Sequence, residues 1–347
     1  MREILVNPKI KLGSRYVGKE EPVYIIAEGG LTNWGNLELA KKQADVSMAA
    51  GADCVKFQAQ TTEELASAKV DPFWYKRLKY KELSHKELTE LWRYVSVRNI
   101  DCGITAHTDV DLDFLDKKLN VPFFKVGSGE SVNYDFLKNV GRRKKPVVMS
   151  LGLHLTDDEI LKSVKVLKDS GALGVAILHC STVYPTPPKI SDLGAIERLQ
   201  KLLPDCVIGY SDHSVGWHLP LAAVALGAKI IEKHISFDKK DKRSLDCPGS
   251  CEPDDLKEMV AQIRDVEAAL KQPGNEREEA VKNARKWARQ SIVARLNIPK
   301  GKMLTKEMIA FKRPGAGLSP DEAHKIVGKK ATRAIEADTL VTLKDVK

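Results

Sequence analysis

Eight short apolar runs in the first 235 residues constrain the fold of this chain more than any other feature. Segments with helical periodicity, such as 36–51, 156–171 and 190–203, lie between them. Near-continuous apolar strands that alternate with amphipathic helices indicate parallel strands covered by helices. Eight such repeats favour an α/β fold closed into a (β/α)8 TIM barrel. A doubly wound open sheet is the alternative, disfavoured because no Gly-x-Gly-x-x-Gly follows the first strand. The runs are 23–28, 54–58, 101–106, 122–127, 146–150, 175–180, 206–211 and 229–235.

The pattern changes after the predicted barrel domain, which we assign to residues 1–272. Residues 273–290 open with Pro-Gly and are highly charged, which predicts a linker with a helical segment. Residues 291–347 show short alternating runs, Gly and Pro turns and a brief helical pattern at 320–328. They predict a separate small α+β domain. A domain of this size buries a modest core, so we expect it to pack on the barrel or on a partner chain.

Composition excludes several classes of protein. No apolar run approaches the roughly 20 residues of a membrane helix, and the N-terminal 13 residues lack the apolar segment of a secretory signal. The six cysteines have no paired spacing, which predicts buried thiols and a cytoplasmic location. The net charge of +9 is spread over many helix faces without an aromatic-interleaved basic stripe. It suits an anionic substrate and argues against nucleic acid.

Polar residues stand at the ends of nearly all the predicted strands. In a barrel these ends meet at the C-terminal face, where barrel enzymes build their active sites. One such residue alone is an ordinary helix cap or a hydrogen-bonded polar group. Eight strands in succession with this feature predict a site. The residues are Glu28, Lys56, Gln58, Thr105, His107, Lys125, Ser128, Glu130, Ser150, Tyr184, Ser211, His213, Lys233 and His234.

Two histidines, His213 and His234, end the last two predicted strands. Adjacent strands lie about 4.8 Å apart, so the two imidazoles can share one divalent ion. Two histidines with open positions suit Mn²⁺, Fe²⁺, Zn²⁺ or Co²⁺ acting as a Lewis acid. Asp246, twelve residues after His234, could assist through an ordered loop. A pair of hydrogen-bonded structural histidines is the alternative.

A second set of residues favours a small polyanion. Lysines inside otherwise apolar strands are specific signals, because burying one without a partner costs on the order of several kcal/mol. Each should therefore face an anion. Hydroxyl donors and the flexible Gly127-Ser128-Gly129 backbone add to this set, although such a tripeptide alone is usually an ordinary turn. The set is Lys56, Lys125, Ser128, Ser150 and Ser211.

Several motifs together resemble the sialic acid synthase family, over essentially the whole chain from about residue 20. They include EPVYIIAEGG, VPFFKVGSGE, KPVVMSLG, LHCSTVYPTPP, IGYSDHSVGWHLPLAAVALGAKIIEKHISFDK and KRPGAGLSPDEAHKIVGKK. The resemblance implies a TIM barrel followed by an antifreeze-like (SAF, β-clip) domain, in a domain-swapped homodimer. It also implies condensation of phosphoenolpyruvate with an N-acylated amino sugar such as N-acetylmannosamine, with release of phosphate by C–O cleavage and formation of a nine-carbon 2-keto sugar acid.

The resemblance also implies residue roles. The metal, Mn²⁺ with Mg²⁺ or Co²⁺ as alternatives, would polarise the aldehyde of the open-chain sugar for attack by C3 of phosphoenolpyruvate. Carboxylates would stabilise positive charge at C2 until water adds there. The metal ligands would be His213 and His234, and the residues that bind phosphoenolpyruvate would be Lys56, Lys125, Ser128, Ser150 and Ser211. The residues that face the sugar would be Glu28, Tyr184 and Asp246, and Arg313 of the partner chain would reach its N-acyl group. The catalytic carboxylates would be Glu28, Glu130 and Asp246.

The chain departs from the family pattern around the expected sugar. The metal and phosphoenolpyruvate residues are intact, so the departures affect the acceptor more than the reaction. They leave open, as the alternative to N-acetylmannosamine, a diacetamido 6-deoxy sugar that leads to legionaminic- or pseudaminic-type acids. The departures are Thr32-Asn33-Trp34-Gly35 for Asn-His-x-Gly, Ser244-Leu245-Asp246-Cys247 for Gly-Pro-Asp-His, Val183 for Asn, and Leu151 and Ala106 for Thr.

Three other functions remain as alternatives. Condensation with a sugar phosphate, as in the seven- and eight-carbon sugar-acid synthases, is disfavoured by the C-terminal domain, and dependence on a phosphorylated acceptor would decide it. A non-catalytic carbohydrate-binding protein has no need for paired histidines, strand lysines and rim carboxylates. A metal-dependent barrel hydrolase would use more histidines or a carboxylated lysine.

Overall fold

The computed structural model describes residues 8–271 and 274–347. The chain divides into two compact units, Met1–Leu270 and Lys271–Lys347, which are described separately below. The predicted boundary between residues 272 and 273 lies outside the described residues. Residues 1–7 also lie outside the described residues, and they belong to the N-terminal segment in which we expected no secretory signal.

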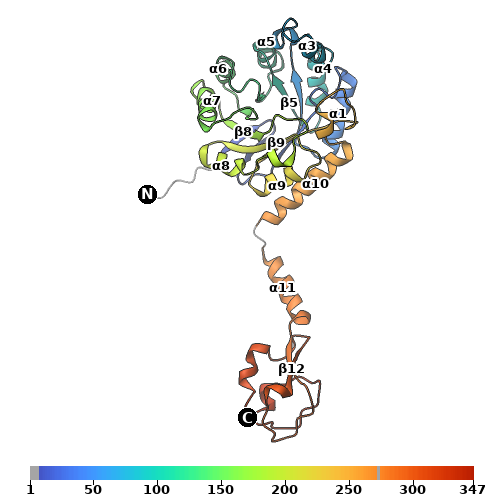
Figure 1. Ribbon diagram of the computed structural model, residues 1–347, viewed down its shortest axis with the longest axis vertical. Helices are drawn as coiled ribbons and strands as arrows, with labels where there is room; N and C mark the ends of the chain where they lie inside the picture. Colours follow the sequence, from blue (N-terminus) through green and yellow to red (C-terminus); the bar gives the residue numbers. More distant parts are fainter. Residues whose placement is uncertain (1–7, 272–273) are drawn as a thin grey trace. The chain divides into compact units, whose positions relative to one another are not determined.

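The first unit is a closed barrel of eight parallel strands (Figure 1). Its strand order is β10-β3-β4-β5-β6-β7-β8-β9, which confirms the predicted TIM barrel. Strand β10 closes the barrel on β3 and sets His234 beside Glu28. The strands are β3 (Tyr24–Glu28), β4 (Cys54–Ala59), β5 (Asp101–Ala106), β6 (Phe124–Val126), β7 (Val147–Ser150), β8 (Val175–Cys180), β9 (Val207–Asp212) and β10 (Ile230–His234).

Helices surround the barrel, and the main core lies between them and the outward faces of the strands (Figure 1). Two of these helices begin with capping boxes, Ser84 with Glu87 and Thr156 with Glu159, which satisfy free backbone N–H groups of the first turn. The helices are α1 (Leu37–Ala49), α4 (His85–Ser96), α5 (Asp109–Phe114) with a π-helical continuation η1 (Leu115–Leu119), α6 (Tyr134–Arg142), α7 (Asp157–Asp169), α8 (Ala195–Leu202), α9 (His218–Ala225) and α10 (Pro253–Leu270).

An N-terminal hairpin closes the end of the barrel where the strands begin. Its strands are β1 (Lys9–Leu12) and β2 (Arg15–Gly18), which pair antiparallel. Their buried side chains join a cluster with residues from the starts of the barrel strands, including Tyr24 and Phe123. This half of the interior is therefore apolar. The open, polar half lies at the carboxyl ends of the strands, and the sequence pattern did not predict the hairpin that creates this asymmetry.

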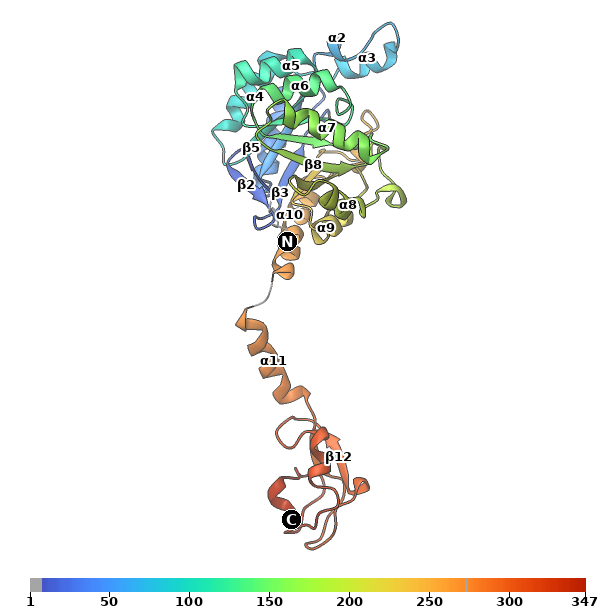
Figure 2. The same ribbon diagram turned by 90° about the vertical axis from the view of Figure 1, so that its left-hand side faces the viewer.

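An excursion between β4 and α4 carries two further short helices, α2 (Thr62–Leu65) and α3 (Pro72–Lys79), which extend away from the barrel (Figure 2). Asp71 caps α3 by accepting a hydrogen bond from the backbone N–H of Trp74. The loops after the sixth and eighth barrel strands contain single 3-10 turns, η2 (Pro188–Ile190) and η3 (Cys247–Gly249).

The second unit has its own small core, which gathers ten buried apolar residues from Ile292 to Val346. Helix α11 (Asn275–Ala288) precedes the antiparallel pair β11 (Ser291–Ala294) and β12 (Ile309–Lys312). The helical pattern at 320–328 is a 3-10 helix, η5 (Pro320–Lys325), in the structure. The other 3-10 turns are η4 (Lys306–Met308) and η6 (Leu343–Asp345).

Two expectations from composition are met in the described part of the chain. All six cysteines are free and buried, as the absence of paired spacing predicted. Across residues 8–271 and 274–347, no helix combines the length and the apolar character that crossing a membrane requires.

Candidate active site

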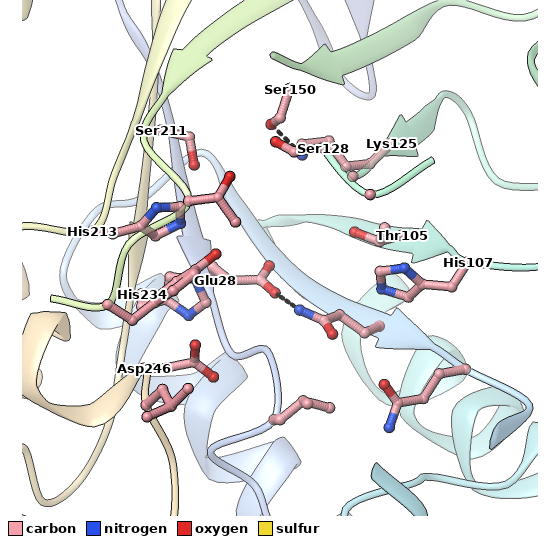
Figure 3. A pocket seen from close by; sticks show the side chains of 18 of the residues that line it. Glu28, Thr105, His107, Lys125, Ser128, Ser150, Ser211, His213, His234 and Asp246 are labelled. Atoms are coloured by element: carbon pink, nitrogen blue, oxygen red, sulfur yellow. Dashed lines mark hydrogen bonds between the residues drawn. The ribbon is translucent and has the colours of Figure 1, made fainter. Parts of the chain in front are cut away.

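A cavity of about 420 Å³ opens at the carboxyl ends of the barrel strands. Its walls are polar because parallel strands in a closed barrel bring their last residues to one face. Figure 3 shows side chains from separate strands converging on this space. Of the strand-end and loop residues predicted for the site in the first unit, all except Lys233 line it: Glu28, Lys56, Gln58, Thr105, His107, Lys125, Ser128, Glu130, Ser150, Tyr184, Ser211, His213, His234 and Asp246.

Lys56 lies buried at the base of the cavity among acceptors. Its ammonium forms an ion pair with Glu28 and donates a hydrogen bond to Thr105 Oγ1 at 3.0 Å. A second carboxylate, Glu232, approaches to 3.9 Å. Burial alone would lower the pKa of Lys56, but Glu232 and Glu28 outweigh burial and raise it. The predicted anionic partner of this strand lysine is therefore present within the chain.

Lys125 lies beside Lys56 and has fewer compensating charges. Its Nζ donates a hydrogen bond to Ser150 Oγ at 2.8 Å, and Glu232 Oε1 lies 3.7 Å away. Burial lowers the pKa of Lys125, and the neighbouring Lys56 adds to this effect although Glu232 opposes it. Two ammonium groups and nearby hydroxyls thus face the same part of the cavity.

Glu232 is the central residue that the sequence analysis did not assign. It accepts a hydrogen bond from Ser211 Oγ at 3.1 Å and lies within 4 Å of both lysine ammonium groups. Burial would raise its pKa, but Lys125 and Lys56 outweigh burial and lower it. The signal was present in the strand period: residues i and i+2 face the same side, so Glu232 points into the barrel with His234.

The two predicted metal ligands lie side by side, with ring centroids 5.3 Å apart. The Tyr184 ring contacts both, at 4.2 Å from His213 and 6.3 Å from His234. His213 Nδ1 lies 2.7 Å from the Ser181 carbonyl oxygen, an acceptor that requires the proton on Nδ1 and leaves the lone pair on Nε2. Burial, followed by the charge of His234, lowers the pKa of His213 to about 4. The ring is therefore neutral near pH 7, as a metal ligand must be.

The donor set fits an open rather than a complete metal site. His234 Nδ1 is buried without a hydrogen-bond partner in the described structure. Within residues 8–271 and 274–347, no three His, Cys, Asp or Glu side chains are arranged to hold a metal ion. Two imidazoles therefore fit a metal whose other ligands come from substrate and water.

Carboxylates line the rest of the cavity. Glu28 accepts a hydrogen bond from Gln58 Nε2 at 2.8 Å. Glu130 Oε1 lies 3.1 Å from His107 Nδ1, and the outer atoms of this pair, Oε2 and Nε2, are buried without described hydrogen-bond partners. Asp246 accepts a hydrogen bond from Ser244 Oγ at 3.0 Å. Ser128 Oγ accepts one from the backbone N–H of Gly152 at 2.9 Å.

Lys233 was predicted to point at the rim of the barrel, and this prediction is wrong. It is fully buried and faces the opposite side of β10, where its ammonium donates to Asp212 Oδ2 at 2.5 Å and to the Ser214 carbonyl at 2.6 Å. Strand alternation is the reason, because its neighbour His234 occupies the inward position. Arg313 belongs to the second unit, where it follows β12 and is exposed, so its contact with the sugar stays a prediction.

The excursion after β4 contributes a wall of the cavity that the sequence analysis missed. Helix α3 and the residue two positions after it supply cations and an aromatic ring to this wall. No periodicity in the sequence links the excursion to the barrel mouth, because its position depends on long-range packing. Its cavity-lining residues are Gln60, Leu65, Trp74, Arg77, Leu78 and Lys81.

Comparison with known proteins gives two matches to family models: the NeuB family over residues 44–275 and the SAF domain over residues 289–347. The human N-acetylneuraminate-9-phosphate synthase is 35% identical, over 94% of this chain and 93% of the human protein. The N,N'-diacetyllegionaminic acid synthase of Campylobacter jejuni is 34% identical, over 91% of this chain and 98% of its own length.

A solved structure agrees with these matches. The N-acetylneuraminic acid (sialic acid) synthetase of Leptospira borgpetersenii, in complex with citrate, has a TM-score of 0.73 and 31% identity, covering 80% of this chain and 96% of that chain. The matches to the human and Campylobacter synthases thus extend over more than nine tenths of this chain, and the solved structure covers 80% of it. This chain belongs to the NeuB family of sialic acid synthase enzymes and ends in an SAF domain.

Proposed function

We propose that this chain condenses phosphoenolpyruvate with an N-acylated amino sugar of the N-acetylmannosamine type, giving a nine-carbon 2-keto sugar acid and phosphate. The observation that carries the proposal is the division of one cavity into two chemical regions. Buried lysines with hydroxyl donors lie in one region, and paired histidines with a tyrosine and carboxylates lie in the other.

The lysine region suits the phosphate and carboxylate of phosphoenolpyruvate. Lys56 and Lys125 supply point charges, and hydroxyls of Ser128, Ser150 and Ser211 supply hydrogen-bond donors. The Lys125–Ser150 and Ser211–Glu232 hydrogen bonds hold these groups in position. Ser150 accepts from Lys125 and keeps its own O–H for the substrate, whereas the Ser211 O–H must turn from Glu232 to donate to it.

His213 and His234 would hold a divalent metal, with Mn²⁺ as the expected ion. Such a metal supplies Lewis-acid polarisation of the acceptor's aldehyde oxygen. The residues around it orient the sugar: Tyr184 packs on both imidazoles, and Asp246 and Glu28 offer acceptors for sugar hydroxyl groups. The hydrogen bond from Gln58 fixes the Glu28 carboxylate.

The carboxylates complete the chemistry. C3 of phosphoenolpyruvate forms a bond with the aldehyde carbon as the C=O π bond breaks; the aldehyde oxygen takes up a proton and becomes a hydroxyl, and positive charge develops at C2. Glu28, Glu130 and Glu232 stabilise this charge. Water then adds to C2 and its proton passes to a carboxylate, for which Glu130 is suited because His107 Nδ1 lies 3.1 Å from its Oε1. The C2–O bond to phosphate breaks, leaving the 2-keto acid and free phosphate.

The proposal includes a domain-swapped homodimer, in which Arg313 of one chain contacts the N-acyl group of the sugar in the other. It is supported by the exposure of Arg313 and by the small core of the second unit. Light scattering together with an Arg313→Ala variant tests it. A fully active monomer, or unchanged KM for the sugar in the variant, would remove Arg313 from the site.

The test of the reaction is release of phosphate from phosphoenolpyruvate with Mn²⁺, with and without EDTA. The acceptor panel contains N-acetylmannosamine, its 6-phosphate and a diacetamido 6-deoxy sugar. Release that needs both the metal and one of these acceptors is expected. Folded, metal-loaded protein that releases no phosphate with any of them would contradict the proposal.

A further inference from the structure

Lys81 is a buried cation at the cavity wall with no described counterion. Its side chain is 5% exposed and lines the cavity. Among residues 8–271 and 274–347, its ammonium has neither a hydrogen-bond acceptor nor a carboxylate within ion-pair distance. Its described contact is the Trp34 ring, whose centroid lies 5.2 Å away. Burying a cation this way is unfavourable unless the site gains an anion when it functions.

Arg77 is a second cation on the same wall with unused hydrogen-bonding capacity. Its Nη2 donates to the Arg243 carbonyl oxygen at 3.2 Å, which fixes the guanidinium. Its Nε is buried without a hydrogen-bond partner in the described structure. Arg77 and Lys81 lie four residues apart, at the end of α3 and just beyond it. We call these two residues the outer cations.

The wall that carries the outer cations is held in place by the loops after β3 and β10. Trp34 stacks near Tyr80, and the Arg243 guanidinium lies 4.2 Å from the Trp34 centroid. Arg243 is paired with Asp241 at 2.6 Å, so its charge is already balanced. Both loops depart from the family pattern, at Thr32 and Asn33 in the first and at Ser244, Leu245 and Cys247 in the second. Trp34, which directly follows the first departure, contacts Lys81.

Both negative and positive charges act on Lys81, and one of them, Asp246, links the outer cations to the histidine pair. Burial lowers the pKa of Lys81, with Asp246 opposing this effect and Arg77 adding to it, and with smaller contributions from Cys247 and Asp241. The charge of Asp246 also acts on the pKa of His213. Asp246 thus stands within electrostatic reach of both the histidine pair and the outer cations.

We propose that Lys81 and Arg77 bind a phosphate monoester carried by the acceptor sugar at the carbon furthest from its aldehyde. This inference rests on the proposed function. With the aldehyde at the histidine pair and the sugar hydroxyls at Asp246, the far end of the sugar meets the outer cations. An ammonium and a guanidinium, each with a free N–H, match the oxygens of a phosphate dianion. A 6-deoxy sugar lacks the oxygen that would carry this phosphate, so the inference excludes diacetamido 6-deoxy sugars as the preferred acceptor.

The experiment compares N-acetylmannosamine with N-acetylmannosamine 6-phosphate in metal-loaded wild type and Lys81→Met. Wild type should prefer the phosphorylated acceptor at least 100-fold in kcat/KM. Lys81→Met should reduce that preference by about 100-fold, mainly through KM, because it removes one charge-assisted donor to a dianion. Lys81→Arg should restore most of it. The matched control is Lys79→Met, an exposed lysine paired with Glu63 and Glu82, which should keep the wild-type preference.

Binding of the same sugar phosphate, measured by calorimetry without phosphoenolpyruvate, separates this inference from the proposed function. Absence of turnover with every acceptor, together with sugar-phosphate binding that Lys81→Met abolishes, would defeat the proposed reaction but support the subsite. Turnover with equal or better use of the unphosphorylated sugar would overturn the subsite and leave the reaction standing. An unchanged preference in a folded Lys81→Met protein, checked by thermal melting, would also overturn it.

Discussion

The cavity contains cations at its inner end, Lys56 and Lys125, and at its outer end, Lys81 and Arg77. The charges of these two pairs are balanced in different ways. At the inner end, Lys56 has Glu28 and Glu232 as counterions, and Lys125 shares Glu232 with it. At the outer end, Lys81 has no carboxylate within ion-pair distance among the described residues, and Arg77 contacts a carbonyl oxygen. The pKa shifts follow the number of nearby carboxylates rather than the end of the cavity: the pKa of Lys56, with two, is raised, and the pKa values of Lys125 and Lys81 are lowered.

This contrast suggests different roles for the two ends: the inner end is rigid and serves the reaction, and the outer end selects the acceptor. A cation held by carboxylates and hydroxyls keeps its place with or without substrate, which suits a site where charge develops during the reaction. A cation without a counterion binds an anion with a larger gain, because its own desolvation is already complete. We therefore expect changes at the inner end to impair the reaction with every acceptor, and changes at the outer end to alter the choice of acceptor.

The largest expected effect is at the histidine pair, which serves both ends. His213→Ala and His234→Ala should each lower kcat by about 10³-fold or more with every acceptor, since either change removes one of the two proposed ligands of the Lewis-acid metal. Steady-state phosphate release measures this, and metal content by mass spectrometry should fall in parallel. His218→Ala, at an exposed position on α9, is the control. Near-normal turnover in either variant would refute the metal assignment.

The next effect tests the inner counterion. Glu232→Gln leaves Lys56 and Lys125 with less negative charge and should lower the free energy of unfolding by about 3 kcal/mol, the size expected when a buried pair loses one partner. Activity should fall about 100-fold with phosphorylated and unphosphorylated acceptors alike. Urea unfolding and initial rates measure the two quantities. Glu90→Gln, which removes an exposed ion pair with Lys41, should change neither. A selective loss with one acceptor would break the contrast.

A smaller effect is expected at the second outer cation. Arg77→Met should raise KM for the 6-phosphate about 10-fold and leave kcat within about 2-fold, because one of several donors to the dianion is lost. The effect should be weaker than that of Lys81→Met, since Arg77 already donates to a carbonyl. Lys76→Met, exposed on the same helix, provides the comparison. An equal rise in KM for the unphosphorylated sugar would mean that Arg77 supports the fold of the wall rather than the phosphate.

The smallest effect is a pH dependence of binding. Lys81 binds a dianion only while protonated, and its lowered pKa means that this charge is lost as pH rises at values below those of an ordinary lysine. Affinity for the sugar phosphate should therefore fall a few-fold as the pH rises, before it reaches the ordinary lysine pKa of about 10.4. Lys56, with a raised pKa, stays charged over this range. Calorimetry across the range should give a flat profile for Lys81→Arg, and a flat wild-type profile would contradict the assignment.

The sequence placed most of the site because barrel topology turns strand order into spatial position. Residues that end separate strands, such as Glu28, Lys125 and His234, were predicted to meet before any distance was known, and all three line the cavity. The resemblance of the chain to the sialic acid synthase family pointed to the same residues. Glu232 was missed and Lys233 was wrongly placed at the rim. Whether each side chain points into or out of the barrel depends on its position in the alternation of the strand rather than on residue type.

The sequence by itself therefore determined the eight strands, their parallel arrangement and the polar face at their carboxyl ends, since each follows from local pattern and chain order. Only the tertiary structure decided that a hairpin closes the opposite end and that α3 brings Arg77 and Lys81 to the cavity. It alone decided which carboxylate balances which lysine. These features depend on contacts between segments distant in the chain, and local periodicity carries no information about such contacts.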